Sequence, residues 1–122
     1  MRHRKRTIIL INMNNLTGTT IYDFLEGWDY TPLRIKNAEI LTPILSAGNR
    51  QLILFQFQEF SESEYAMLAL IRKMNPQIPI LATSPFISIR DTIRIIKAGA
   101  VDYISQPFNP MDLKRAIQKY DG

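Results

Sequence analysis

Uncharged polar side chains gather at the ends of the predicted strands, where an α/β protein would hold its chemistry. These stretches are Asn12 to Asn15, Gln56 to Phe60, Thr83 to Pro85 and Ser105 to Asn109. Amides and hydroxyls donate and accept hydrogen bonds, but an amide nitrogen is not a nucleophile. The chain has no cysteine, and His3 has no second histidine to join it, so thiolate chemistry and a Cys/His metal site are excluded.

The elements that position these side chains alternate along the chain. Strands are predicted at residues 7–11, 31–36, 52–55, 79–82 and 101–105, and the second is expected at a sheet edge. Helices are predicted to start at Asn15 or Thr17, Asn37, Ser61 or Ser63, Ser88, and Asn109 followed by Pro110. Glycines 27, 48 and 99 are predicted to end three of them. Such alternation predicts a doubly wound α/β fold, a parallel sheet with helices on both faces. Ligands then bind at the carboxyl ends of the strands.

Composition predicts one domain at residues 7–122, preceded by a basic arm at residues 1–6. The chain has 122 residues and a net charge of +4, with fifteen basic and eleven acidic residues. Four of the basic residues are Arg2, Arg4, Lys5 and Arg6, so fifteen less four leaves a neutral body. A basic arm could contact nucleic acid or an anionic membrane, but a solvated lead-in is favoured. Without a membrane span or signal peptide in the sequence, we expect a cytoplasmic protein.

The second half carries a motif of considerable length. Ile80 to Ser84, Ile93 to Lys97, the run Ala98-Gly99-Ala100-Val101-Asp102-Tyr103, and Gln106 to Pro110 follow one pattern almost residue for residue. This pattern resembles the receiver domains of bacterial response regulators (the CheY-like superfamily). The resemblance implies a flavodoxin-like (βα)5 fold with strand order 2-1-3-4-5, and a role in two-component (phosphorelay) signal transduction.

The resemblance also assigns functional roles to positions of the chain, and several of these positions carry a side chain that differs from the family's functional residue. Gln56 stands at the phosphoacceptor aspartate, and Asn12 and Met13 stand at the acid pair that holds Mg²⁺. Gln106 stands at the position of the lysine that precedes the proline, here Pro107. The Gln106–Pro107 peptide bond is predicted to be cis. The switch hydroxyl and aromatic are kept as Thr83 and Tyr103. Both are equally well explained as ordinary strand-end residues.

These substitutions predict a pseudo-receiver, neither an enzyme nor a metal or cofactor protein. Mg²⁺ prefers carboxylates and water, and acyl-phosphate formation needs a carboxylate nucleophile. Glu59 and Glu62 follow the third strand and could reach a cation, although solvated loop acids are expected. Asn12, Gln56 and Gln106 are expected to form an amide network in place of the family's charged cluster of acids and lysine.

The partner surface is predicted on the fourth helix, fifth strand and fifth helix. Its residues are Arg90, Arg94, Ile95, Ile96, Lys97 and Tyr103. Ile95 and Ile96 point about 100° apart, so both cannot centre on the core stripe with Ile89 and Ile93. The expected partner is a kinase, effector or output domain, or a second copy of the chain. The basic stripe is otherwise a solvated face, and neither membrane nor nucleic acid is expected to bind this domain alone.

Two alternatives stay open. The first is a response regulator that is phosphorylated in an unusual way. The second is a small flavin- or nucleotide-binding protein, because residues 15–20, Asn-Leu-Thr-Gly-Thr-Thr, resemble the phosphate loop of flavodoxins. Hydroxyls and N–H groups at a helix start bind phosphate.

Overall fold

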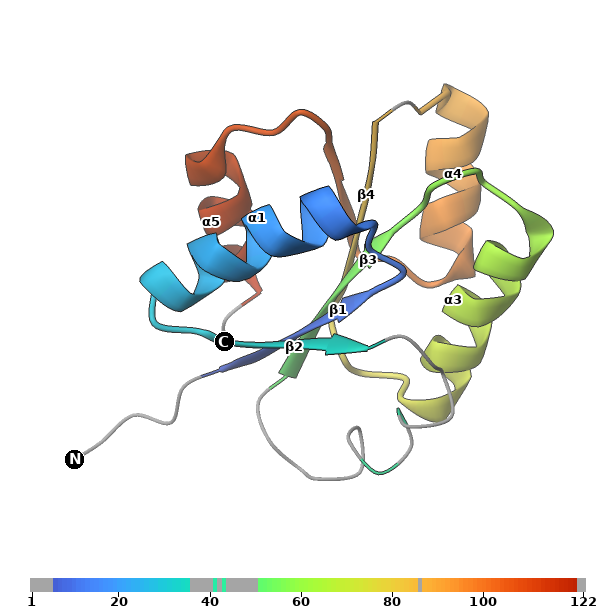
Figure 1. Cartoon of the computed structure of the whole chain (residues 1–122). Coiled ribbons are helices and arrows are strands. Elements are labelled where there is room, and N and C mark those ends of the chain that lie inside the picture. Colours follow the sequence, from blue (N-terminus) through green and yellow to red (C-terminus); the bar gives the residue numbers. More distant parts are fainter. Residues whose placement is uncertain (1–5, 36–40, 42, 44–50, 86, 121–122) are drawn as a thin grey trace.

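Five parallel strands form one sheet in the order β2-β1-β3-β4-β5 (Figure 1). The structure is a computed structural model and describes residues 6–35, 41, 43, 51–85 and 87–120. The strands are β1 (Thr7–Ile11), β2 (Thr31–Ile35), β3 (Gln51–Gln56), β4 (Ile80–Ser84) and β5 (Asp102–Ser105). The predicted order and the predicted edge position of the second strand are both confirmed.

Helices cover both faces of the sheet (Figure 1). They are α1 (Asn15–Gly27), α3 (Glu62–Met74), α4 (Ile89–Ala98) and α5 (Pro110–Lys119). Helices α1 and α5 pack on one face, where Ile8 and Leu10 meet Ile21 and Leu113. Helices α3 and α4 pack on the other face. Alternate residues of each central strand therefore enter different cores.

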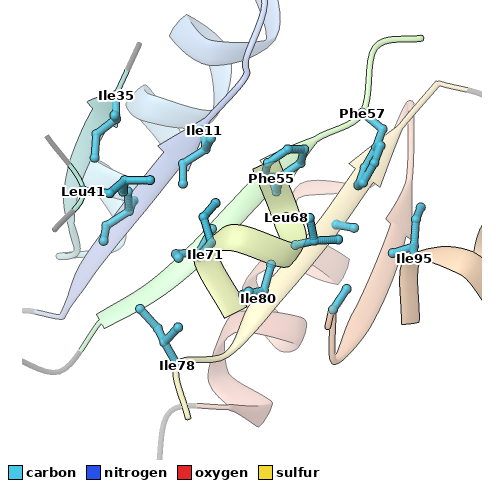
Figure 2. Close-up of a cluster of buried hydrophobic side chains, with 14 of the residues drawn as sticks. Ile11, Ile35, Leu41, Phe55, Phe57, Leu68, Ile71, Ile78, Ile80 and Ile95 are labelled. Carbon is cyan, nitrogen blue, oxygen red and sulfur yellow. The ribbon is translucent and has the colours of Figure 1, made fainter. Parts of the chain in front are cut away.

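The core beneath α3 and α4 is shown in Figure 2. Leu68 and Ile71 of α3 and Ile95 of α4 lie against residues of the strands, including Ile11, Phe55 and Ile80. All six side chains are buried. Because β3 is buried along its whole length, the residue at its carboxyl end is presented inside the protein.

Side-chain caps start the helices at the polar strand ends. The Asn14 side chain accepts from the Thr17 N–H at 2.8 Å, so Asn14 caps α1. The prediction of Asn15 or Thr17 as the cap is therefore wrong by one residue or more, because three neighbouring polar residues offered equivalent oxygens. Ser88 and Asn109 cap α4 and α5 as predicted.

Most of one predicted helix lies outside the described residues, and one residue of the predicted arm belongs to the folded body. The helix predicted from Asn37 to Gly48 lies outside the described residues, except for Leu41, which is buried, and Pro43. Arg6, counted with the arm, is 7% exposed and donates to the Gln51 carbonyl. Its own carbonyl accepts from the Thr31 N–H at 2.9 Å, which draws Arg6 into the folded body. No helix among the described residues is long and apolar enough to cross a membrane.

Candidate functional site

The carboxamide of Gln56 lies at the carboxyl end of β3, fully buried. Its Oε1 accepts a hydrogen bond from the Asn14 N–H at 3.1 Å. Its Nε2 is buried and has no hydrogen-bond partner among the described residues. The position that the resemblance assigns to the phosphoacceptor therefore holds a neutral side chain whose oxygen accepts a hydrogen bond from the chain's own backbone.

Asn12 connects the end of β1 to that of β3. Its Nδ2 donates to the Gln56 carbonyl at 2.9 Å and to the Glu64 carboxylate at 2.6 Å. The Asn12 carbonyl accepts from Gln58 Nε2 at 2.7 Å. The φ of Asn12 is 60°, a left-handed conformation that asparagine tolerates better than most residues. Its nitrogen, rather than an oxygen, thus faces the nearest carboxylate.

Met13 differs from Asn12 because its side chain enters the core below α1. Its carbonyl accepts from Arg34 Nη2 of β2 at 2.9 Å. The same Arg34 nitrogen reaches Asn15 Oδ1 at 3.3 Å. The two residues that the resemblance assigns to the acid pair therefore supply a buried thioether and an amide whose nitrogen donates to the Glu64 carboxylate.

Thr83 and Gln106 form a second hydrogen-bonded group on β4 and the β5–α5 loop. Thr83 lies beside Gln56 in the strand register, and its hydroxyl donates to the Ile104 carbonyl at 2.6 Å. Gln106 Nε2 donates to the Thr83 hydroxyl oxygen at 3.1 Å. The Gln106–Pro107 peptide bond is cis, which is the predicted isomer.

Tyr103 contacts the same strand one residue further along. Its hydroxyl donates to the Ser84 carbonyl at 3.0 Å and lies 2.8 Å from Ser84 Oγ. Ser84 is fully buried, whereas Tyr103 is half-buried. The structure thus gives both predicted switch residues defined partners, and Ser84 is a partner that the sequence did not single out.

The predicted amide network divides into two groups. Asn12 and Gln56 bond across β1 and β3, whereas Gln106 bonds to Thr83 across β4 and β5. A backbone bond joins the groups, from the Phe57 N–H to the Thr83 carbonyl at 2.8 Å. The expectation of one network is therefore wrong in its extent, because Gln106 bonds to the Thr83 hydroxyl of β4.

Glu64 is the site residue that sequence reasoning missed. Glu64 as a residue is 7% exposed, and its carboxylate accepts from the N–H groups of Gln58 at 2.7 Å, Glu59 at 3.1 Å and Ser61 at 3.0 Å, besides Asn12. Burial on its own raises the pKa of Glu64, but these four donors outweigh burial and the pKa lies below its usual value. The detectable signal was the capping box Ser61-x-x-Glu64.

The two loop acids that were considered for a cation point elsewhere. Glu59 is exposed. Glu62 forms an ion pair with Arg94, and the hydrogen bond and charge of Arg94 lower the pKa of Glu62. Within the described part of the chain, no group of three or more His, Cys, Asp or Glu side chains could hold a metal ion.

The predicted partner surface on α4 exposes apolar side chains. Ile89, Ile93 and Ile96 are 83%, 50% and 46% exposed, while Ile95 is fully buried. The expectation that at least one isoleucine here is exposed is confirmed, and Ile95 belongs to the core instead of the surface. Arg94 turns toward α3, with its guanidinium carbon 3.9 Å from the Tyr65 ring centroid. Arg90 and Lys97 are exposed.

The segment that resembled a phosphate loop is helical. Residues 15–20 form the start of α1, and the Thr20 hydroxyl donates to the Leu16 carbonyl at 2.9 Å. A helix spreads its hydroxyls around its axis, so this segment does not form a phosphate-binding loop. The adjoining pocket of about 330 Å³ is lined mainly by apolar groups such as Leu16, Phe24 and Phe108.

Comparisons with known proteins agree with the geometry. No family model matches the chain. The chain is 26% identical over 117 residues to the transcriptional regulatory protein ZraR of Salmonella typhimurium, covering 95% of this chain and 26% of ZraR. It is 25% identical over 107 residues to the DNA-binding transcriptional regulator NtrC of Rhizobium meliloti, covering 88% of this chain and 22% of NtrC.

Among solved structures, a response regulator from Thermotoga maritima superposes with a TM-score of 0.78 at 23% identity, over 95% of this chain and 97% of that one. The chain spans about a quarter of the length of the curated relatives it matches. The relatives and structural neighbours together support the interpretation of this chain as a response-regulator receiver (CheY-like) domain.

Proposed function

We propose that this domain is a pseudo-receiver of two-component signal transduction, which acts as a protein-interaction module without Asp/Mg²⁺ phosphorylation. Gln56 carries the proposal. Its side chain ends β3 fully buried, and its oxygen accepts from the Asn14 N–H. A carboxamide cannot form an acyl phosphate, because that step needs a carboxylate nucleophile. The domain accordingly has no catalytic role of its own.

The pocket residues do not fit Mg²⁺. The ion prefers oxygen ligands in octahedral geometry and usually takes one or two carboxylates. Met13 packs its thioether into the core, and Asn12 presents its amide nitrogen to Glu64. The Glu64 oxygens already accept four hydrogen bonds. No step of the proposed function therefore passes through a metal.

The exposed face of α4 supports the interaction role. Ile89, Ile93 and Ile96 repeat at intervals of four and three residues, which places them on one side of the helix. Arg90 and Lys97 flank this stripe. We propose that a cytoplasmic protein partner (a kinase, effector or output domain, or a second copy of the chain) covers this α4 face together with β5 and α5.

The metal-binding part of the proposal is tested by Mg²⁺ dependence of unfolding. Ligand-linked stabilisation requires binding, so millimolar Mg²⁺ should leave the midpoint of thermal unfolding unchanged. Ca²⁺ at equal ionic strength is the control for screening. A midpoint that rises with Mg²⁺ alone would favour the phosphorylatable alternative, and purified protein carrying a yellow flavin would favour the cofactor alternative.

The interaction part is tested by sedimentation and by binding to candidate kinases and output domains. Ile93→Asp places a charge at the centre of the α4 stripe without touching the core. It should abolish any self-association or partner binding that wild-type protein shows. Leu70→Asp is the matched control, because Leu70 is similarly exposed on α3. Equal loss in both variants, or in neither, would contradict the α4 assignment.

A further inference from the structure

The loop between β3 and α3 is built around an anion that the chain itself supplies. Three backbone N–H groups, of Gln58, Glu59 and Ser61, converge on the carboxylate of Glu64 at 2.7–3.1 Å. Backbone N–H groups that converge from one turn in this way form an anion-binding concavity, which is called the N–H nest below. The nest begins two residues after Gln56, the phosphoacceptor-equivalent position.

Glu64 also reaches out of its own loop. Its Oε2 accepts from Asn12 Nδ2 at 2.6 Å, across 52 residues of sequence. The same Asn12 nitrogen donates to the Gln56 carbonyl at 2.9 Å. One carboxylate therefore links α3 to the ends of both β1 and β3, which a helix cap alone does not require.

The backbone of the loop needs such support. Phe60 has a φ of 55°, a left-handed conformation that costs energy for a bulky side chain. Its ring stacks on that of Phe57 at a centroid distance of 5.5 Å. Phe57 in turn donates its N–H to the Thr83 carbonyl, so the loop conformation is connected to β4.

We propose that Glu64 is a built-in anion that fills the N–H nest and holds the pocket in one conformation. The inference rests on the proposed function and adds its regulation. A receiver without a phosphoacceptor has no external anion to set its state, and Glu64 sets that state permanently. Ser84 completes the arrangement at β4 by binding the Tyr103 hydroxyl. The α4 face is then presented independently of any phosphoryl donor.

Four variants separate this role from simple helix capping. Glu64→Ala removes the anion, and Glu64→Gln keeps its shape while removing its charge. Ser61→Ala breaks the other half of the capping box, the bond from the Glu64 N–H to Ser61 Oγ, and leaves the Glu64 carboxylate in place. Glu62→Gln neutralises an exposed acid two residues away.

Amide hydrogen exchange and NMR of the full chain provide the readout. We expect Glu64→Ala to speed exchange at Gln58 and Glu59 at least tenfold, and to shift the Asn12 side-chain amide and the Tyr103 ring resonances. Glu64→Gln should give the same pattern more weakly, which keeps the test usable if the alanine variant does not fold. Ser61→Ala and Glu62→Gln should leave the Asn12 and Tyr103 signals unchanged.

The proposal is overturned if Ser61→Ala moves the Asn12 signal as much as Glu64→Gln does, because Glu64 would then act only as a cap. It is also overturned if Tyr103 of wild-type protein exchanges between two environments, since the pocket would not be held in one state. Phosphorylation of the wild-type protein is scored separately by mass. A phosphorylated protein with an unchanged exchange pattern would refute the proposed function while leaving Glu64 as the occupant of the nest.

Discussion

The two halves of the pocket differ in how closely they match the receiver pattern. At β4 and β5, Thr83 and Tyr103 match the receiver pattern and have defined hydrogen-bond partners, and the Gln106–Pro107 bond after β5 is cis. At the ends of β1 and β3, the positions that the resemblance assigns to acids hold Asn12, Met13 and Gln56. Under the proposed function, β4 and β5 form the half that retains the receiver pattern, and β1 and β3 form the half in which the side chains that would hold a phosphoryl group are replaced.

Neighbouring isoleucines on α4 give the largest expected contrast. Ile95 is fully buried and Ile93 is half-exposed, so Ile95→Ala should cost about 2–5 kcal/mol of unfolding free energy. Ile93→Ala should change it by less than about 0.5 kcal/mol. Urea denaturation measures both. Similar losses would mean that α4 packs differently and that its apolar stripe is not a free surface.

Restoring one acid on β3 should destabilise the protein rather than revive it. Gln56→Asp buries a carboxylate. Position 106 holds glutamine instead of a lysine that could pair with it, and positions 12 and 13 hold no acid that could help it bind a metal ion. Desolvation should raise the pKa of the new acid, and the broken amide contacts should cost about 1–3 kcal/mol near neutral pH. Gln77→Asp, at an exposed site, is the control. A stabilised Gln56→Asp variant would show that the pocket still accommodates charge.

The connection from α4 to β5, next to the half that retains the receiver pattern, contains a glycine that should not tolerate a side chain. Gly99 ends α4 with a φ of 127°, and a Cβ there would lie 2.9 Å from Cγ of Arg72. Gly99→Ala should therefore cost about 1–2 kcal/mol in thermal unfolding. Gly27 has no atom within 4 Å of such a Cβ, so Gly27→Ala should be neutral or slightly stabilising. A neutral Gly99→Ala would indicate that the α4–β5 connection adapts easily.

Acid titration addresses the replaced half with a smaller effect. The folded pKa of Glu64 lies below its unfolded value, so its contribution to stability is fully present above the unfolded pKa. That contribution is lost as pH falls through the lower folded pKa. As the pH falls below the unfolded pKa, wild-type protein should therefore lose more stability than Glu64→Gln, measured by urea denaturation at each pH. Parallel curves of stability against pH for the two proteins would show that the charge of Glu64 does not stabilise the pocket.

Much of the fold was predictable from local patterns. Buried apolar runs alternating with capped helices predict the parallel sheet, and β2 is recognisable as an edge strand by its polar residues. The location of the neutral residues Asn12, Gln56 and Gln106 at the ends of strands could be predicted from the sequence. Their partners could not, because hydrogen bonds such as Gln106 to Thr83 join residues 23 apart in sequence.

Glu64 shows where sequence reasoning stopped. The pattern Ser61-x-x-Glu64 indicates a helix start, but nothing local reveals that the carboxylate also meets Asn12. That contact depends on how β1 and β3 pair and on the left-handed backbone of Asn12. The division of the expected amide network has the same origin, since strand register decides which polar groups are neighbours.

Intact mass after treatment with acetyl phosphate and Mg²⁺ tests the central claim most directly. The comparison includes wild type, Gln56→Asp, and the fourfold variant Asn12→Asp, Met13→Asp, Gln56→Asp, Gln106→Lys. The account predicts no added phosphoryl group on wild type or on Gln56→Asp, with Mg²⁺ binding recovered only in the fourfold variant. A stable phosphoryl group on the wild-type protein, mapped to a residue of this pocket, would contradict it.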